Sequence, residues 1–343
     1  MKDSLKHLFD FLEQGVSPFH AAAWAAKELK GAGFEELDLK KNWKLEKGGR
    51  YFVIPFGTTL YAFTVGGGKG VEGGVRGAGA HTDTPVLKVK PHPEMIRHGH
   101  LQLNTEVYGG PILNTWFDRP LSLAGRVALR REGGGAEARP VNIARPVLCL
   151  PNLAVHMNRG VNENGKPIQN QKELLPIVMM TDRKEPGDAF RELLAEELGV
   201  QSESILDWDL CLYNPEKPKT AGWKDEFVVS PRLDDLDSCA ALVHGLIGGG
   251  TRDGLNLVCL FDNEEVGSRS KQGADSEMPL LILSKVCRAF GMDMTETLSL
   301  ASEGLMLSAD VAHAYHPNYP ETQDITNYPV MGGGFIFKSA AWP

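Results

Sequence analysis

The chain has 343 residues, of which 42% are hydrophobic and 23% are charged, and its net charge is −8. This length is sufficient for two domains, and the composition is that of a globular protein. Basic residues are dispersed along the chain, which excludes the concentrated positive patch that binds nucleic acid or anionic membranes. No apolar run is long enough to cross a bilayer. The five cysteines lie mostly in apolar stretches, as expected of core residues in a reducing cytoplasm.

The first 90 residues are predicted to form a helix followed by strands. Ser17 and Pro18 are a typical cap and first-turn pair, so we expect a helix that ends near Gly31. Residues 50–56 and 58–65 are strand-like. The glycine-rich residues 66–74 contain no Ser or Thr after the lysine, which argues against a phosphate-binding loop and favours a hairpin loop.

The pattern then changes twice along the chain. Between about residues 91 and 224, short alternating segments separated by Gly, Pro and Asn predict antiparallel strands, with one helix at 188–199. From residue 225 onward, apolar strands alternate with helices, which is typical of a parallel sheet covered on both faces. We therefore predict an α/β fold in which a three-layer domain with a mostly parallel sheet (1–90 and 225–343) is interrupted by a β-rich insertion domain (91–224).

Four of the predicted strands end in residues that bind metal ions. The strand at residues 75–80 leads into His81 and Asp83, and the strand at 226–229 leads into Asp234. The strand at 255–261 leads into Glu264 and Glu265, and the strand at 305–308 leads into Asp310. In such sheets, ligands bind beyond the carboxyl ends of the strands. One polar strand end is commonplace in a solvated loop, but four that share imidazole and carboxylate groups favour a metal site. This donor set suits zinc, manganese or cobalt.

Two adjacent glutamates at one of these strand ends can divide the chemistry of such a site. Successive side chains in an extended segment point in different directions, so one of Glu264 and Glu265 can bind metal while the other handles the proton of a water molecule. Two ions bridged by a carboxylate would hold a hydroxide ready to attack a carbonyl group. A surface position for both carboxylates is the alternative.

Six segments of the sequence resemble, in the same order, motifs of the aspartyl aminopeptidase family of dinuclear zinc metallopeptidases. The segments are GAHTDTPVLKVKP, YGGPILNTWFDRPLSLAGRV, LAVHMNRGVN, SPRLDDLDSC, LFDNEEVGSRSKQGA and SADVAHAYHPNY. The resemblance extends from the N-terminal helices to about Lys338. It implies a metal-dependent aminopeptidase that removes N-terminal residues, Asp or Glu in particular, from peptides. It also implies a homo-oligomer, which in the family is a tetrahedral dodecamer.

The same resemblance implies a role for each motif residue. The implied ligands of two divalent ions, with zinc expected and manganese or cobalt as alternatives, are His81, Asp234, Glu265 and Asp310. Asp234 matches the bridging carboxylate, Glu264 matches the general base, and Asp83 matches the carboxylate that orients His81 or the base. The residues implied to contact substrate are His156, His313 and Lys338. For His156, metal binding is a second interpretation.

The sequence departs from the family pattern after Lys338, where it ends with SAAWP at Pro343. The family continues to a late histidine that binds the second metal, so we expect this ion to be under-coordinated. Two alternatives therefore stay open. One is a catalytically impaired peptide-binding or scaffold homologue, and the other is a different di-metal amidohydrolase, such as a deacylase or a carboxypeptidase. Asp235 and Asp237 are predicted to be charges at a helix N-terminus and not ligands.

Overall fold

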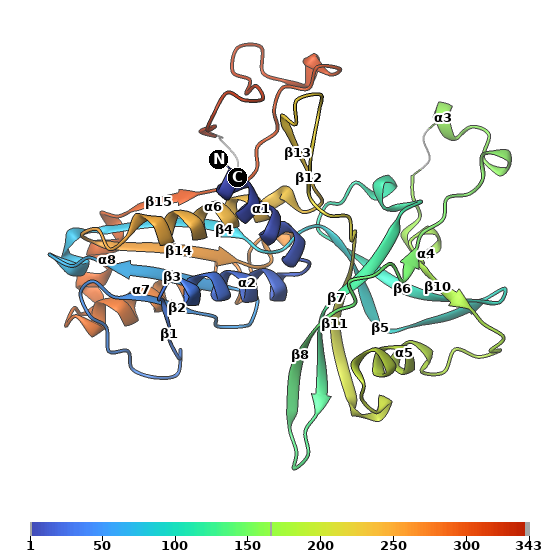
Figure 1. Cartoon of the computed structure of the whole chain (residues 1–343), viewed down its shortest axis with the longest axis horizontal. Helices are drawn as coiled ribbons and strands as arrows, with labels where there is room; N and C mark the ends of the chain where they lie inside the picture. The colour runs from blue at the N-terminus through green and yellow to red at the C-terminus, as the bar shows by residue number, and fades with distance from the viewer. Residues whose placement is uncertain (1, 165–166, 340–343) are drawn as a thin grey trace.

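The computed structural model describes residues 2–164 and 167–339 and contains two large β-sheets that lie side by side (Figure 1). The terminal residues in which the sequence departs from the family pattern, beyond Ser339, lie outside the described residues. The strands of the first sheet are, in spatial order, β1 (Glu35–Glu36), β2 (Arg50–Val53), β3 (Leu60–Val65), β14 (Leu255–Phe261), β4 (Val75–His81) and β15 (Leu305–Ser308). Parallel pairs join β1 to β2 and join β4 to both β14 and β15, whereas β3 pairs antiparallel with β2 and β14.

Helices cover both faces of this six-stranded sheet. The helices on one face are α1 (Lys2–Gln14), α2 (Pro18–Gly31) and α6 (Leu233–Gly249), and those on the other are α7 (Met278–Ala289) and α8 (Met294–Ser302). The apolar side chains of β3 contribute to the hydrophobic clusters on both faces of the sheet. Leu60 and Ala62 pack towards α1, α2 and α6, whereas Tyr61, Phe63 and Val65 pack towards α7, because successive side chains of a strand point to opposite faces. The predicted three-layer α/β architecture is confirmed.

The second sheet has seven strands and is largely antiparallel. Its spatial order is β11 (Ile205–Tyr213), β5 (Val86–Arg97), β6 (His100–Tyr108), β10 (Ile177–Met180), β9 (Leu148–Cys149), β7 (Pro120–Arg130) and β8 (Ala136–Asn142). Because β11 also pairs with β7, the sheet closes on itself as a barrel. Helix α5 (Ala189–Leu198) packs against it through Phe190 and Leu194. The short helices α3 (Val161–Asn164) and α4 (Asn170–Glu173) lie in its connections.

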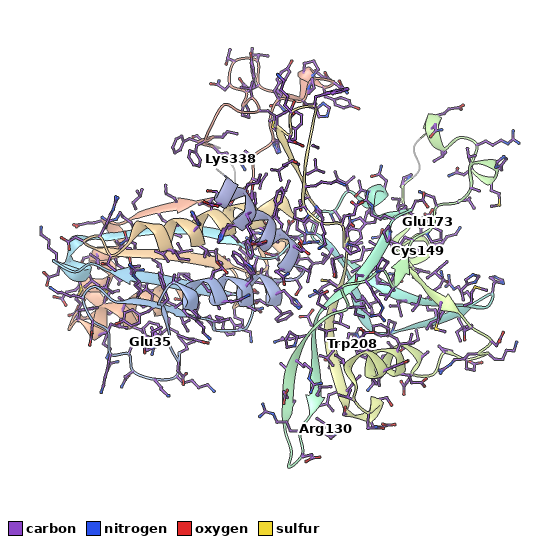
Figure 2. All side chains as sticks on the ribbon, in the orientation of Figure 1. Glu35, Arg130, Cys149, Glu173, Trp208 and Lys338 are labelled. Atoms are coloured by element: carbon purple, nitrogen blue, oxygen red, sulfur yellow. The ribbon has the colours of Figure 1, made fainter. Side chains whose placement is uncertain are left out.

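The β-rich insertion that interrupts the α/β fold is thus present, and its first strand, β5, begins shortly after β4 of the first sheet ends. The predicted boundary at residue 91 falls inside β5, whereas the seven-stranded sheet starts at Val86. The division into two domains stays a prediction. Four of the cysteines are buried as expected, but Cys149 is exposed on the seven-stranded sheet (Figure 2). Within the described ranges, no helix is both long and apolar enough to cross a membrane.

Two local predictions were wrong. Residues 226–229 do not join the six-stranded sheet, because β13 (Phe227–Val229) pairs only with β12 (Lys219–Ala221) in a separate hairpin. Phe227 and Val229 are exposed there, so their apolar pattern does not mark a buried strand. The glycine-rich segment 66–74 is not a hairpin loop either, since β14 lies between the two strands that it connects.

Candidate metal centre

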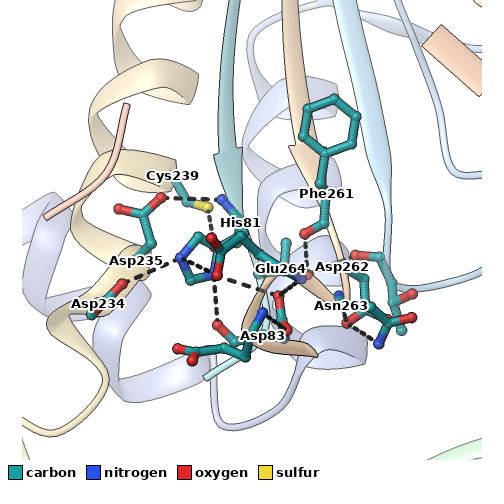
Figure 3. Close-up of polar contacts among 12 residues, drawn as sticks. His81, Asp83, Asp234, Asp235, Cys239, Phe261, Asp262, Asn263 and Glu264 are labelled. Carbon is teal, nitrogen blue, oxygen red and sulfur yellow. Dashed lines mark hydrogen bonds and ion pairs between the residues drawn. The ribbon is translucent and has the colours of Figure 1, made fainter. Parts of the chain in front are cut away.

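The candidate site lies where the first sheet meets the second, at the carboxyl ends of β4 and β14 (Figure 3). His81 is the last residue of β4, and the chain then runs through a short connection into β5. Phe261 ends β14 and is followed by the turn that carries Glu264 and Glu265. Asp234 lies in the first turn of α6, which packs against β4. Three elements from distant parts of the sequence therefore bring an imidazole and several carboxylates together.

The donor atoms of these residues form two groups that share one histidine. Ligand atoms of His81, Asp234 and Glu265 lie within 4.8 Å of one another, and so do those of His81, Asp235 and Asp310. The Nε2 atom of His81 is 3.2 Å from Oδ1 of Asp234. The Oδ1 atom of Asp235 is buried and has no hydrogen-bond partner among the described residues. Buried polar atoms are rarely left unpaired, so a cation at this position would satisfy it. Nitrogen and carboxylate donors of this kind fit zinc.

The ring of His81 is oriented for binding through Nε2. Its Nδ1 atom is 3.0 Å from the backbone oxygen of Asp83 and 3.4 Å from the carboxylate of the same residue. With Nδ1 occupied by Asp83, Nε2, which faces Asp234, is the nitrogen that can bind a metal ion once it has lost its proton. Burial lowers the pKa of His81, but hydrogen bonds to Asp234 and Asp83 outweigh it and raise the pKa to about 11. A metal ion would have to displace the Nε2 proton that this raised pKa retains.

The carboxylate of Asp83 is almost completely buried, at 1% exposure, and is held by several donors. It accepts hydrogen bonds from the hydroxyl of Tyr108 at 2.6 Å and from the backbone N–H groups of Glu264 at 3.2 Å and Glu265 at 3.1 Å. Burial raises the pKa of Asp83, but the hydrogen bonds with His81 and Tyr108 hold it below its usual value. Asp83 is thus an ionised, fixed partner for the histidine ring. Tyr108 begins the motif segment YGGPILNTWFDRPLSLAGRV, but no role for it was predicted from the sequence.

The remaining carboxylates of the strand-end segments differ in their surroundings. Burial raises the pKa of Glu265 to about 7, with further upward contributions from Asp234 and Asp83 that His81 opposes. Burial likewise raises the pKa of Asp235 to about 7. Crowded, buried carboxylates of this kind are stabilised by a cation. Asp262 belongs to neither group, since its oxygens accept hydrogen bonds from Gln272 and from the N–H of Asn263.

Residues 11–341 match the family model described as aminopeptidase I zinc metalloprotease (M18). The chain belongs to the M18 aminopeptidase family. A probable M18 family aminopeptidase 2 from Clostridium novyi is 42% identical over 347 residues, covering 99% of this chain and 80% of that protein. The structure of Ape4 in complex with Nbr1 has a TM-score of 0.90 at 33% identity, covering 96% of this chain and 67% of that one. The S. cerevisiae mApe1 dodecamer has a TM-score of 0.78 at 26% identity, covering 95% and 75%.

Membership in the M18 family confirms the resemblance seen in the motifs and makes zinc the expected metal. The structure groups Asp310 with His81 and Asp235, and not with Asp234 as the motifs implied. Asp235 does lie in the first turn of α6, but its side chain is also buried. Its carboxylate accepts a 3.1 Å hydrogen bond from the backbone N–H of His81. That Asp235 is not a ligand stays a prediction, whereas its burial depends on the packing of α6 against β4 and could not be read from the sequence.

The three residues implied to contact substrate in this M18 chain lie apart from the buried part of the site. Lys338 is exposed on the side of the six-stranded sheet, and its Nζ atom is 3.5 Å from Oδ2 of Asp310 (Figure 2). His313 is exposed in the same C-terminal segment, three residues after Asp310. His156 is exposed in a short 3-10 helix (Val155–Met157) between β9 and β10 of the other sheet. Among the described residues, no hydrogen bond or ion pair joins His156 to the two donor groups.

A cleft of about 340 Å³ opens beside Asp234. Its walls come from the start of α6, from the connection between β4 and β5, and from the segment that contains Trp116 and Arg119. The Nε atom of Arg119 is buried without a hydrogen-bond partner among the residues that the structure describes. The cleft therefore combines an apolar wall, a guanidinium group and direct access to a candidate metal ligand.

Proposed function

We propose that this chain is a metal-dependent aminopeptidase that hydrolyses the first peptide bond of peptides with an acidic N-terminal residue. The observation that carries the proposal is the convergence of ligand atoms from His81, Asp234 and Glu265 within 4.8 Å, beside the open cleft. Zinc bound there would supply Lewis acidity to the scissile carbonyl and would lower the pKa of a water molecule. Proton transfer and substrate binding are assigned to side chains of the protein.

The proposed assignment gives His81 and Asp310 to one ion, Glu265 to a second, and Asp234 to both as a bridge. Its support is that Asp234 shares a donor group with Glu265 and lies 3.2 Å from the histidine, whereas Asp310 shares the other donor group with His81. Asp235 is an additional candidate ligand for the first ion. Elemental analysis of zinc in Glu265→Gln and Asp310→Asn variants, each compared with the unmodified chain, tests this assignment.

Glu264 is the proposed general base. Its carboxylate is half exposed, and its Oε2 atom lies 3.9 Å from Nε2 of His81, so it borders the ligand cluster and also faces solvent. The backbone N–H of Glu264 is held by Asp83, which fixes the turn that presents the side chain. From this position the carboxylate can take a proton from water and pass it to the leaving amine.

The preference for acidic substrates is supported by the charge of the cleft. Arg119 and Arg232 both line the cleft, the Nε atom of each is buried without a hydrogen-bond partner among the described residues, and guanidinium groups bind carboxylates in paired hydrogen bonds. The second arginine of the cleft, Arg232, donates to the backbone oxygens of Asn214 at 3.0 Å and Leu12 at 2.8 Å, so part of its donor capacity is used. Lys338, His313 and His156 are the other candidates for substrate contact.

A substrate panel tests the proposed activity. After loading with zinc, manganese or cobalt, the chain should release the first residue from Asp and Glu peptides faster than from Leu peptides, and N-acetylated versions should not react. Cleavage of the acetylated peptides would indicate a deacylase or another amidohydrolase. Peptide binding without turnover after metal loading would favour the catalytically impaired homologue. The ratio of Asp to Leu cleavage should fall in Arg119→Gln or in Lys338→Ala, and a residue whose variant keeps the ratio has no part in selectivity.

We also propose that the chain forms a homo-oligomer and acts in the cytoplasm. The support for assembly is the likeness to the S. cerevisiae mApe1 structure, which is a dodecamer. Light scattering coupled to size-exclusion chromatography measures the mass in solution. A monomer across the accessible range of protein concentrations would contradict the proposed assembly.

A further inference from the structure

The seven-stranded sheet reaches the candidate metal centre through the last residue of β6. Tyr108 pairs with Val86 at the start of β5, so its position is set by the strand register of that sheet. Its hydroxyl nevertheless donates a 2.6 Å hydrogen bond to Oδ2 of Asp83, which directly follows the six-stranded sheet. The ring is half buried, and the ammonium group of Lys88 lies 5.2 Å from its centre. Both the backbone and the ring of Tyr108 are therefore held independently of Asp83.

A chain of hydrogen bonds fixes the direction of the Tyr108 hydroxyl. The N–H of Gln272 donates to Oγ of Ser270, which leaves the Ser270 hydroxyl to donate to Oδ1 of Asn263 at 2.6 Å. The amide nitrogen of Asn263 then donates to the Tyr108 oxygen at 2.9 Å. Because that oxygen already accepts a hydrogen bond, its own hydrogen is directed to Asp83. Each bond in such a chain polarises the next and strengthens the final donor.

The residue after Tyr108 packs against the glutamate turn of the site. Gly109 has a φ angle of +72°, and a Cβ atom added to it would lie 3.0 Å from the Cβ of Glu265. The end of this strand therefore touches the centre twice, through the Tyr108 hydroxyl on the carboxylate behind His81 and through Gly109 beneath Glu265.

We infer that Tyr108 is a positioning residue of the metal centre, through which the seven-stranded sheet holds the Asp83 carboxylate, and with it the His81 ring, in the orientation that binds metal. This inference rests on the proposed function, since it needs His81 to be a metal ligand. It assigns the second sheet a part in metal affinity in addition to its own packing.

The test is the affinity of the full-length chain for zinc, measured by competition with a chromophoric chelator after the protein has been stripped of metal. Residues that orient a metal ligand typically contribute 10- to 100-fold to metal affinity. Tyr108 contacts Asp83, which orients His81, and does not orient His81 directly, so Tyr108→Phe should weaken zinc binding roughly 10-fold. Tyr61→Phe is the matched control, because the Tyr61 hydroxyl is also buried but has no hydrogen-bond partner among the described residues. Its zinc affinity should equal that of the unmodified chain.

A double-mutant cycle shows whether Tyr108 acts through Asp83. In an Asp83→Asn background, the additional Tyr108→Phe change should weaken zinc binding less than it does in the unmodified chain. Equal effects in both backgrounds, or a Tyr108→Phe protein that binds zinc as tightly as the Tyr61→Phe control, would overturn the inference. The proposed function fails differently: if His81→Ala binds zinc as tightly as the unmodified chain, the metal site itself has been placed wrongly.

Discussion

Replacing Asp83 with alanine would remove the acceptor of three hydrogen bonds at once, those from the Tyr108 hydroxyl and from the backbone N–H groups of Glu264 and Glu265. Asp83 is only 1% exposed, so water cannot easily replace it. Each lost hydrogen bond costs roughly 1 kcal/mol, which gives a loss of about 3 kcal/mol in the free energy of unfolding of the metal-free protein. This is a large part of the 5–15 kcal/mol that is typical of folded proteins.

Urea unfolding followed by tryptophan fluorescence measures this loss, and Asp324→Ala is a matched control. Asp324 also accepts two backbone N–H groups, from Thr326 at 2.9 Å and Asn327 at 2.8 Å, but it is exposed, so water can take its place. Its replacement should cost roughly 1 kcal/mol or less. Equal losses in Asp83→Ala and Asp324→Ala would refute the argument that Asp83 is a buried organising acceptor.

Three further predictions concern the site and the acid stability of the fold. Glu264→Gln should lower peptide hydrolysis by about 10²- to 10⁴-fold while the zinc content stays unchanged, and loss of zinc would contradict its role as a base. Gly109→Ala should weaken zinc binding, because the new Cβ meets Glu265, whereas Gly110→Ala, which has open space around it, should not; equal affinities would show that the turn can shift freely. Burial lowers the pKa of His20 to about 4, so between pH 6.5 and 4 the unfolded chain gains a proton that the folded chain does not bind, and stability falls by up to roughly 3 kcal/mol. His20→Asn should therefore lose less stability over this range in urea unfolding, and parallel pH curves for the two proteins would contradict the shift.

The parts of the fold that could be predicted are those in which the local pattern coincides with the tertiary environment. The run that forms β14 is apolar on both faces because helices cover both sides of the sheet, and its abrupt end in polar residues marks the edge that carries the candidate ligands. Strand β4 ends at the same edge in a polar residue, His81. In contrast, residues 226–229 have the same local pattern but form an exposed hairpin, because the pattern of a short segment does not specify its partner.

The residues of the site that could not be predicted depend on packing between distant segments. Asp234 was predicted, but from a strand at 226–229 that does not join the sheet; it lies beside His81 because α6 packs against β4. Asp235 looks like an ordinary acidic residue in the first turn of a helix until its burial against β4 is known. Tyr108 lies in the other sheet, and no pattern in its own strand indicates that its hydroxyl reaches Asp83.

The measurement that tests the account most directly is the zinc content of three purified proteins after metal loading and desalting: the unmodified chain, His81→Ala and His92→Ala. His92 is an exposed histidine on β5 and is outside both donor groups. We predict that the unmodified chain and His92→Ala retain the same amount of tightly bound zinc and that His81→Ala retains less. Equal zinc in all three proteins, or none in the unmodified chain, would contradict a metal centre at the carboxyl end of β4.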